Sequence, residues 1–195
     1  MNRVFHRPAK EKGYAAWAAR WRVPLGLAVS VAYLVLARPT PGYLAPGSAL
    51  ALAGLGLRAW AAGCLEKSAR LATGGPYART RNPLYLGSSL MGAGFALAGR
   101  SLAMAVALAG LLILIYAPVI RREAAFLESR FGDDYRRYAA RVPLFLPRLG
   151  RVTETAGCFR WSQYRKNHEY EAAIGCAAGV AFLVLRTLGW IPGVS

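Results

Sequence analysis

The sequence predicts an all-α integral membrane protein with about five transmembrane helices, and three observations support this fold class. Of the 195 residues, 55% are hydrophobic and only 17% are charged, which is not the balance of a soluble domain. The apolar residues gather in long segments separated by short polar or proline-rich stretches. The basic residues alternate between these stretches, as in loops on opposite sides of a membrane. We therefore expect one membrane domain over residues 1–195.

The first elements are a basic lead and a set of apolar helices. Residues 1–22 are expected to be cytoplasmic, with Tyr14, Trp17 and Trp21 in the membrane interface. Four long apolar segments follow: Val23–Ala37, Leu44–Leu65, Ser101–Ile120 and Ala172–Trp190. A shorter segment, Leu84–Gly99, covers roughly 24 Å at about 1.5 Å per residue and spans if its flanks lie in the interface.

The connections between these segments set the predicted order of the helices. Prolines and a glycine between residues 39 and 46 predict a brief outer turn before the second helix. Residues 99–101 leave room only for a tight connection, so the third and fourth helices are predicted to form an antiparallel hairpin. Residues 121–171 then form a cytoplasmic segment, and residues 172–190 form the fifth span.

The charge distribution predicts the orientation in the membrane. Lys and Arg total 25 against nine Asp and Glu, and the formal net charge is +16. Twenty-one of the basic residues lie in residues 1–22, 66–83 and 121–171, which places these segments and the N-terminus on the cytoplasmic side of the inner membrane and the C-terminus outside. Anionic lipid headgroups are then the partner of this charge, in preference to nucleic acid. Arg58 and Arg186 fall within helices and must face protein, water or headgroups.

Cysteine and histidine are too few to build a metal or nucleophile site. Cys64, Cys158 and Cys176 are odd in number with no short pairing, so we predict neither a disulfide nor a zinc site. His6 and His168 are too far apart for a metal cluster or a Ser/His/Asp system, which disfavours hydrolase chemistry.

Glycine pairs recur at Gly54 and Gly56, at Gly92 and Gly94, and at Gly175 and Gly179. None follows a predicted strand, so close helix packing explains them better than a nucleotide-binding turn.

The first candidate functional segment is Gly75–Gly87, which reads Gly-Pro-Tyr-Ala-Arg-Thr-Arg-Asn-Pro-Leu-Tyr-Leu-Gly. Pro76 and Pro83 hold the backbone open, and the free N–H groups where the next helix starts can meet an anionic group. The alternative is an interfacial turn anchored by Tyr77 and Tyr85.

The second candidate segment begins at Arg121-Arg122-Glu123. Apolar and aromatic residues follow it with the spacing of one face of a helix that breaks near Gly132: Phe126, Leu127, Phe131, Tyr135 and Tyr138. Residues 142–147 are apolar and bounded by prolines, and we expect them to lie against the bundle or the membrane surface.

Together these segments resemble the isoprenylcysteine carboxyl methyltransferase and phospholipid methyltransferase family. Integral-membrane members carry R-H/N-P-x-Y-x-G where one helix starts, and E-E-x-x-L followed by F-G-x-x-Y-x-x-Y after the next helix. The likeness covers roughly residues 54–147. It implies methyl transfer from S-adenosylmethionine, with the cofactor in a cytoplasmic cavity and a lipid-like acceptor arriving from the bilayer.

The resemblance also implies which residues hold the cofactor. They are Leu71, Ala72, Tyr77, Asn82, Pro83, Leu84 and Tyr85 around it, with Glu123 on its amino group. Arg81 or the N–H groups of the helix start suit the cofactor carboxylate, and aromatic faces and carboxylates suit its sulfonium. No metal is expected.

Three departures from the family pattern concern the acceptor more than the cofactor. Asn82 stands where many members have histidine, and Ala124 replaces the second acidic residue. Val119 stands where the prenylcysteine enzymes place a substrate arginine, so Arg121 or Arg122 would have to bind the acceptor instead.

Residues 167–171, Asn-His-Glu-Tyr-Glu, lie just before the last helix on the same side. Glu169 could act as a catalytic base or a cation partner, and Asn167 and Tyr170 could orient an acceptor headgroup. The alternative is a helix N-cap at Asn167 with acidic residues in the first turn.

The sequence thus predicts methyl transfer to a lipid or another hydrophobic small molecule, which needs alignment and water exclusion more than a nucleophilic side chain. Two alternatives stay open: N-methylation of a phospholipid ethanolamine, and a non-catalytic membrane module that binds anionic lipid or a partner protein. A carboxylate acceptor would need an arginine to hold it, whereas an amine acceptor would need a carboxylate base to remove its proton.

Overall fold

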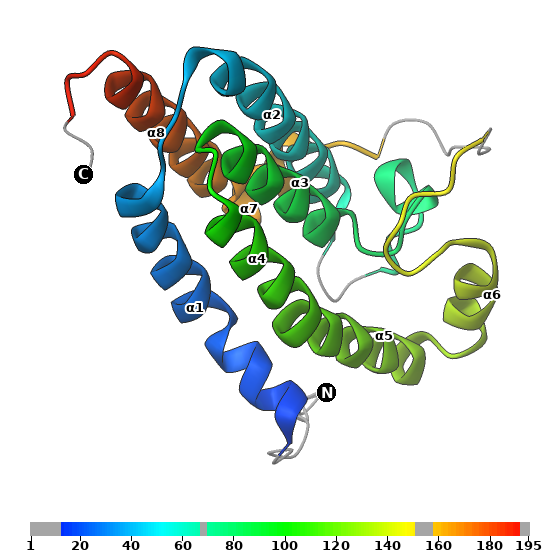
Figure 1. The fold of residues 1–195 in the computed structure, drawn as a ribbon. Coiled ribbons are helices and arrows are strands. Elements are labelled where there is room, and N and C mark those ends of the chain that lie inside the picture. Colours follow the sequence, from blue (N-terminus) through cyan, green and yellow to red (C-terminus); the bar gives the residue numbers. More distant parts are fainter. Residues whose placement is uncertain (1–12, 67–69, 151–157, 192–195) are drawn as a thin grey trace.

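The structure is a computed structural model that describes residues 13–66, 70–150 and 158–191. Every regular element within these ranges is a helix, so the all-α prediction is confirmed. In order they are α1 (Tyr14–Leu36), α2 (Pro41–Cys64), η1 (Gly75–Ala78), α3 (Pro83–Ala98), α4 (Leu102–Gly110), η2 (Leu111–Tyr116), α5 (Ala117–Phe131), α6 (Asp133–Arg141), α7 (Trp161–Lys166) and α8 (Glu169–Thr187). Figure 1 shows the long helices running the length of the molecule, with η1 and α6 gathered at one end.

The first helix starts earlier than predicted. It begins at Tyr14 instead of Val23, so Trp17 and Trp21 belong to the same rod as the predicted span. The proline at position 24 lies inside this helix and does not end it. Residues 1–12 of the predicted lead lie outside the described residues.

The fourth predicted span is also longer than expected, because α4, η2 and α5 form one continuous rod to Phe131. Proline lacks an N–H group, so Pro118 cannot donate to the carbonyl of Leu114 four residues earlier. The wider π-helical turn of η2 lies here, and Tyr14 Oη donates a hydrogen bond of 2.7 Å to that carbonyl. The helix therefore passes the proline without breaking, and it ends only at Gly132, where φ is 53°.

Two of the described helices are long and apolar enough to cross a membrane, Leu102–Phe131 and Glu169–Thr187. Val23–Leu36 and Pro83–Ala98 are apolar but shorter. Large apolar side chains on the outer faces stay exposed, among them Leu27 at 65% and Leu102 at 79%. Such surfaces suit a lipid solvent better than water. The count of five spans and the hairpin of spans stay predictions.

Glycines bring α2 and α3 into backbone contact. A Cβ atom on Gly54 would lie 2.5 Å from the Gly87 carbonyl oxygen, and one on Gly94 would lie 2.6 Å from the Gly47 carbonyl oxygen. Close packing was the predicted role of Gly54 and Gly94, and the structure confirms it. The same prediction is wrong for Gly56 and Gly175, because an added Cβ would meet nothing there within 4 Å among the described atoms.

A disulfide joins Cys64 at the end of α2 to Cys158 before α7, which corrects the prediction that no disulfide forms. Ninety-four residues separate the two cysteines, and the fold brings their Cα atoms to 4.8 Å. Pairing at such a separation cannot be predicted from the spacing of three cysteines. Cys176 is the free cysteine of the described chain and is buried in α8.

The α2–α3 contact makes a prediction with a matched control. Gly54→Ala should lower the free energy of unfolding by roughly 1–3 kcal/mol, because the new methyl group would press on the α3 backbone. Gly56→Ala lies one half-turn away on the same helix and faces open space, so it should leave stability unchanged or raise it slightly. Thermal unfolding in detergent measures both variants. Equal midpoints for the two would contradict the close contact.

Candidate active site

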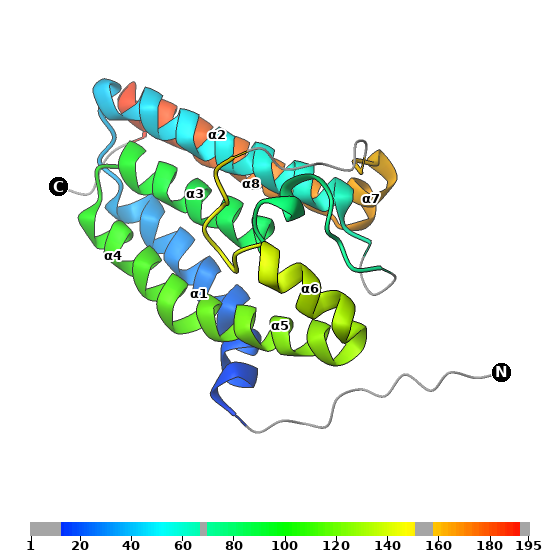
Figure 2. The same cartoon turned by 90° about the vertical axis from the view of Figure 1, so that its right-hand side faces the viewer.

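A cavity of about 730 Å³ lies at the end of the bundle where η1 and α6 gather. Figure 2 shows that η1, α6 and the segment after α6 also lie together when the molecule is turned. All nine residues predicted to hold the cofactor line this cavity: Leu71, Ala72, Tyr77, Arg81, Asn82, Pro83, Leu84, Tyr85 and Glu123. So do the five residues of the predicted helix face, Phe126, Leu127, Phe131, Tyr135 and Tyr138. The structure thus brings both candidate segments to one hollow.

A hydrogen bond joins the two candidate segments directly. Tyr85 Oη, near the start of α3, donates to Glu123 Oε1 on α5 at 2.9 Å. The ring of Tyr116 lies 5.3 Å from that of Tyr85 and adds an aromatic wall beside the pair. The cavity therefore holds a carboxylate next to aromatic faces.

The chain after α6 pairs with the chain just before α3, several of whose residues line the cavity. Arg81 N donates to Pro143 O at 2.9 Å, and Arg148 N donates to Arg79 O at 2.8 Å. The side chain of Asn82 takes part, since its Nδ2 donates to Leu144 O at 2.8 Å instead of capping α3. The apolar 142–147 stretch thus lies against the bundle, as predicted.

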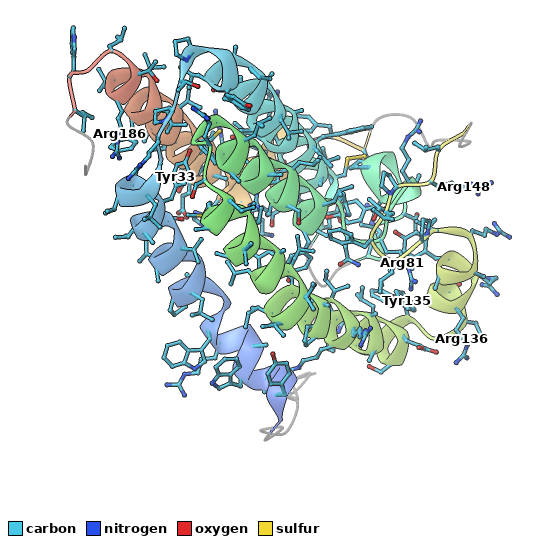
Figure 3. The ribbon with its side chains drawn as sticks, viewed as in Figure 1. Tyr33, Arg81, Tyr135, Arg136, Arg148 and Arg186 are labelled. Carbon is cyan, nitrogen blue, oxygen red and sulfur yellow. A yellow bond between two sulfur atoms is a disulfide. The ribbon has the colours of Figure 1, made fainter. Side chains whose placement is uncertain are left out.

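Tyr77 and Arg81 bring a phenol and a guanidinium to the cavity lining. Tyr77 is 7% exposed, and burial raises the pKa of its phenol well above the ordinary value, so it stays neutral at physiological pH. Arg81 Nη1 donates to Tyr135 Oη at 3.0 Å, and Figure 3 shows these side chains together at the α6 end. Arg81 Nε is buried and has no hydrogen-bond partner among the described residues. Arg81 also lines the cavity, so its guanidinium places a positive charge there.

Sequence reasoning left open whether Arg58 faces protein, water or headgroups, and it did not predict the partner of Arg58. Arg58 lines the cavity from α2, and its Nε and Nη2 donate to Glu169 Oε1 at 2.6 Å and Oε2 at 3.1 Å. A further bond from Arg58 Nη1 reaches Ser88 Oγ on α3. Glu169 is only 5% exposed. An arginine inside an apolar helix needs a buried partner, so the position of Arg58 in the sequence could have indicated a buried ion pair.

The residues predicted for acceptor binding do not line the cavity. Arg121 and Arg122 lie on α5 between the lining residues Tyr116 and Glu123, and their role stays a prediction. Asn167 Nδ2 donates to the carbonyls of Ala62 and Leu65, so it holds the end of α2. The N-cap of α8 is His168, with φ 56°, and not Asn167 as predicted, while the Tyr170 hydroxyl lies 3.0 Å from His168 Nδ1.

Glu169 pairs with the Arg58 guanidinium, and its predicted roles at the acceptor, as a base or a cation partner, stay predictions. Its carboxylate is outside the cavity lining, and both oxygens accept bonds from one guanidinium. This arrangement favours a positioning role for Glu169.

A helical chain whose two motif segments share one cavity is the arrangement that a membrane methyltransferase of the resembled family would require. The family model described as phospholipid methyltransferase matches residues 48–134, which include both segments. This match confirms the resemblance of the chain to this family, the group that includes the isoprenylcysteine carboxyl methyltransferases.

Two relatives are named for metal resistance. The chain is 37% identical over 139 residues to the cobalt-zinc-cadmium resistance protein CzcN of Cupriavidus metallidurans, a match that covers 70% of this chain and 56% of that protein. It is 38% identical over 84 residues to the nickel-cobalt-cadmium resistance protein NccN of Alcaligenes xylosoxydans xylosoxydans, covering 43% of this chain and 39% of the relative. The chain thus spans about half the length of these relatives or less. No solved structure matches it significantly.

The Arg58–Glu169 pair predicts a large loss of stability when one partner is neutralised. Glu169→Gln should lower the free energy of unfolding by about 3 kcal/mol, because it leaves a half-buried guanidinium without its counter-charge. Glu171→Gln is the matched control, since Glu171 lies on the same helix and is 69% exposed. Thermal unfolding in detergent compares them. Equal midpoints would show that the pair does not stabilise the fold.

Proposed function

We propose that this protein transfers a methyl group from S-adenosylmethionine to a hydrophobic acceptor that carries an anionic group, at the membrane boundary. One observation carries the proposal: the Tyr85–Glu123 hydrogen bond puts the two motif segments of a methyltransferase family on one cavity. The family supports methyl transfer, and the lining supports the finer statements about cofactor and acceptor.

The residues of the cavity fit the chemistry of the cofactor. S-adenosylmethionine has an ammonium, a carboxylate and a sulfonium. Glu123 is an acceptor for the ammonium, and the guanidinium of Arg81 is a cationic partner for the carboxylate. The aromatic faces of Tyr85 and Tyr116 suit the sulfonium. These groups come from two separate stretches of the chain, residues 81–85 and 116–123, so the proposed site forms only in the folded protein.

When bound, the cofactor supplies an electrophilic methyl group that an acceptor oxygen can attack in line, with the thioether as the leaving group. The protein then has to align the acceptor with the methyl group and to exclude water. The side chains of Asn82 and Thr80 bond the carbonyl oxygens of residues 144 and 145 at 2.8 and 2.7 Å, which fixes the segment that carries Asn82 at the cavity. The tyrosines buried around the site, such as Tyr77, fill space that water would otherwise occupy. No nucleophilic side chain is required.

The acceptor class follows from the charge that the lining offers. Four arginines and two glutamates belong to the lining: Arg58, Arg70, Arg81 and Arg130 against Glu66 and Glu123. Arg58 is paired with Glu169, and Glu66 with Arg70 and Arg160, so the lining keeps an excess of positive charge. A carboxylate acceptor needs an arginine to hold it and no base, whereas an amine acceptor needs a free carboxylate. The lining therefore favours an acidic acceptor and O-methylation over phospholipid amine methylation.

Cofactor binding is expected to depend on Glu123. Glu123→Gln should weaken the binding of S-adenosylmethionine roughly tenfold or more, because a charged hydrogen bond is lost, and Tyr85→Phe should weaken it by a smaller factor. Glu128→Gln is the control, since Glu128 lies on the same helix outside the lining. Isothermal titration in detergent measures all three. If the wild-type chain binds no cofactor, the non-catalytic membrane module becomes the better account.

The acceptor class is tested by the chemistry of the product. The protein is incubated with a native lipid extract and S-adenosylmethionine that carries a labelled methyl group, and the lipid fraction is then treated with alkali. A methyl ester releases labelled methanol, and we expect this result. Label that stays in the lipid as an N-methyl group would contradict the acidic acceptor while leaving methyl transfer intact.

We further propose that the cavity lies on the cytoplasmic side of the inner membrane, because Lys and Arg are concentrated in the segments at that end. A reducing cytosol disfavours the disulfide seen in the structure, so on this proposal Cys64 and Cys158 would lie side by side as thiols in the cell. Cells should therefore be lysed in a membrane-permeant alkylating reagent, on a Cys176→Ser background. Both remaining cysteines should be alkylated. A disulfide already present in intact cells would instead place this end outside.

A further inference from the structure

A second hollow, also of about 730 Å³, lies on the outer face of α3 and α4, away from the candidate active site. Leu90 and Leu97 on α3 and Leu108 and Leu112 on α4 and η2 belong to its mainly apolar lining. The α3 side extends from Ser89 to Arg100, or roughly 16 Å at about 1.5 Å per residue. A lipid chain is the natural occupant of such a groove on an apolar helix surface.

The groove has a cationic end. Arg100 and Tyr43 both line it there, and the Arg100 guanidinium lies 5.1 Å from the centre of the Tyr43 ring. The Arg100 side chain is exposed. Within residues 13–66, 70–150 and 158–191, no carboxylate forms an ion pair with Arg100. A fixed positive charge therefore stands at the mouth of an apolar groove.

The backbone of Arg100 supplies an independent observation. Its φ is 49°, in the left-handed region that glycine favours, at the position just after the end of α3. Gly99 stands one residue earlier and has an ordinary φ of −84°. The chain thus has an arginine at the one place in this turn where glycine would fit better, which points to a use for the side chain.

We propose that this groove binds an anionic phospholipid, with an acyl chain along α3 and α4 and the phosphate at Arg100. Charge complementarity selects an anionic headgroup over a zwitterionic one, and the apolar lining accommodates the chain. The site is independent of the proposed function, because the candidate active site lies at the other end of α3, around Pro83 and Tyr85.

The test is native mass spectrometry of the full chain released from mixed micelles that contain equal amounts of phosphatidylglycerol and phosphatidylcholine. The wild-type protein should retain phosphatidylglycerol in preference. Arg100→Gly should reduce this preference about fivefold without loss of stability, because glycine suits the backbone at this position. Arg100→Lys should keep most of it. Arg38→Gln is the matched control, since Arg38 lies at the same end, is exposed and does not line the groove.

A second variant fills the groove with a larger side chain. Ala93→Phe should place a ring among the lining residues and lower lipid retention while Arg100 stays in place. Equal retention of both lipids by the wild-type chain would overturn the proposal, and so would unchanged retention in Arg100→Gly. A dimer that forms without lipid and is broken by Ala93→Phe would show that a second copy covers the groove instead.

Discussion

The contact between Tyr85 and Glu123 is the interaction on which the candidate site depends. The two residues lie 38 positions apart in sequence, and their side chains meet at 2.9 Å. They meet because α3 and α4 are joined by only three residues, so the start of α3 and the continuation of α4 into α5 return to the same end of the molecule. The π-helical turn at η2 carries that rod past Pro118 without a break. A kink there would move Glu123 away from Tyr85.

The charged and polar groups around the cavity are held by partners from distant elements. Arg58 is fixed by Glu169 on α8 and Ser88 on α3, and Tyr138 Oη donates to the Tyr77 carbonyl at 2.7 Å. A guanidinium at the edge of an apolar bundle would be costly without such partners. The same pairing holds these side chains in fixed positions, and catalysis by alignment requires fixed positions. The polar network thus serves both the stability of the bundle and the proposed chemistry.

The sequence predicts those features of the site that depend on local patterns, such as residue spacing within one helix and short motifs. The spacing of Phe126, Phe131 and Tyr138 predicts one helix face, and that face lines the cavity. The two paired motif segments predict a shared site, and both segments line the cavity. Helix starts were less accurate, because an aromatic and basic stretch such as residues 14–22 can be helical or irregular until it packs, as Tyr14 does on Leu114.

Interactions between distant parts of the chain could not be predicted. Arg58 and Glu169 are 111 residues apart, and Cys64 and Cys158 are 94 apart. No pattern in the sequence pairs them, since their proximity results from how α2, α7 and α8 pack. Likewise, Gly54 and Gly56 have similar neighbours, yet only Gly54 faces α3.

Hydrogen–deuterium exchange with and without S-adenosylmethionine tests the shared cavity most directly. The account predicts that the cofactor slows exchange in two separate regions at once, residues 71–86 and residues 120–138, while the α3–α4 turn is unaffected. Protection confined to one of these regions, or protection in neither at a saturating cofactor concentration, would contradict a site built by Tyr85 and Glu123 together.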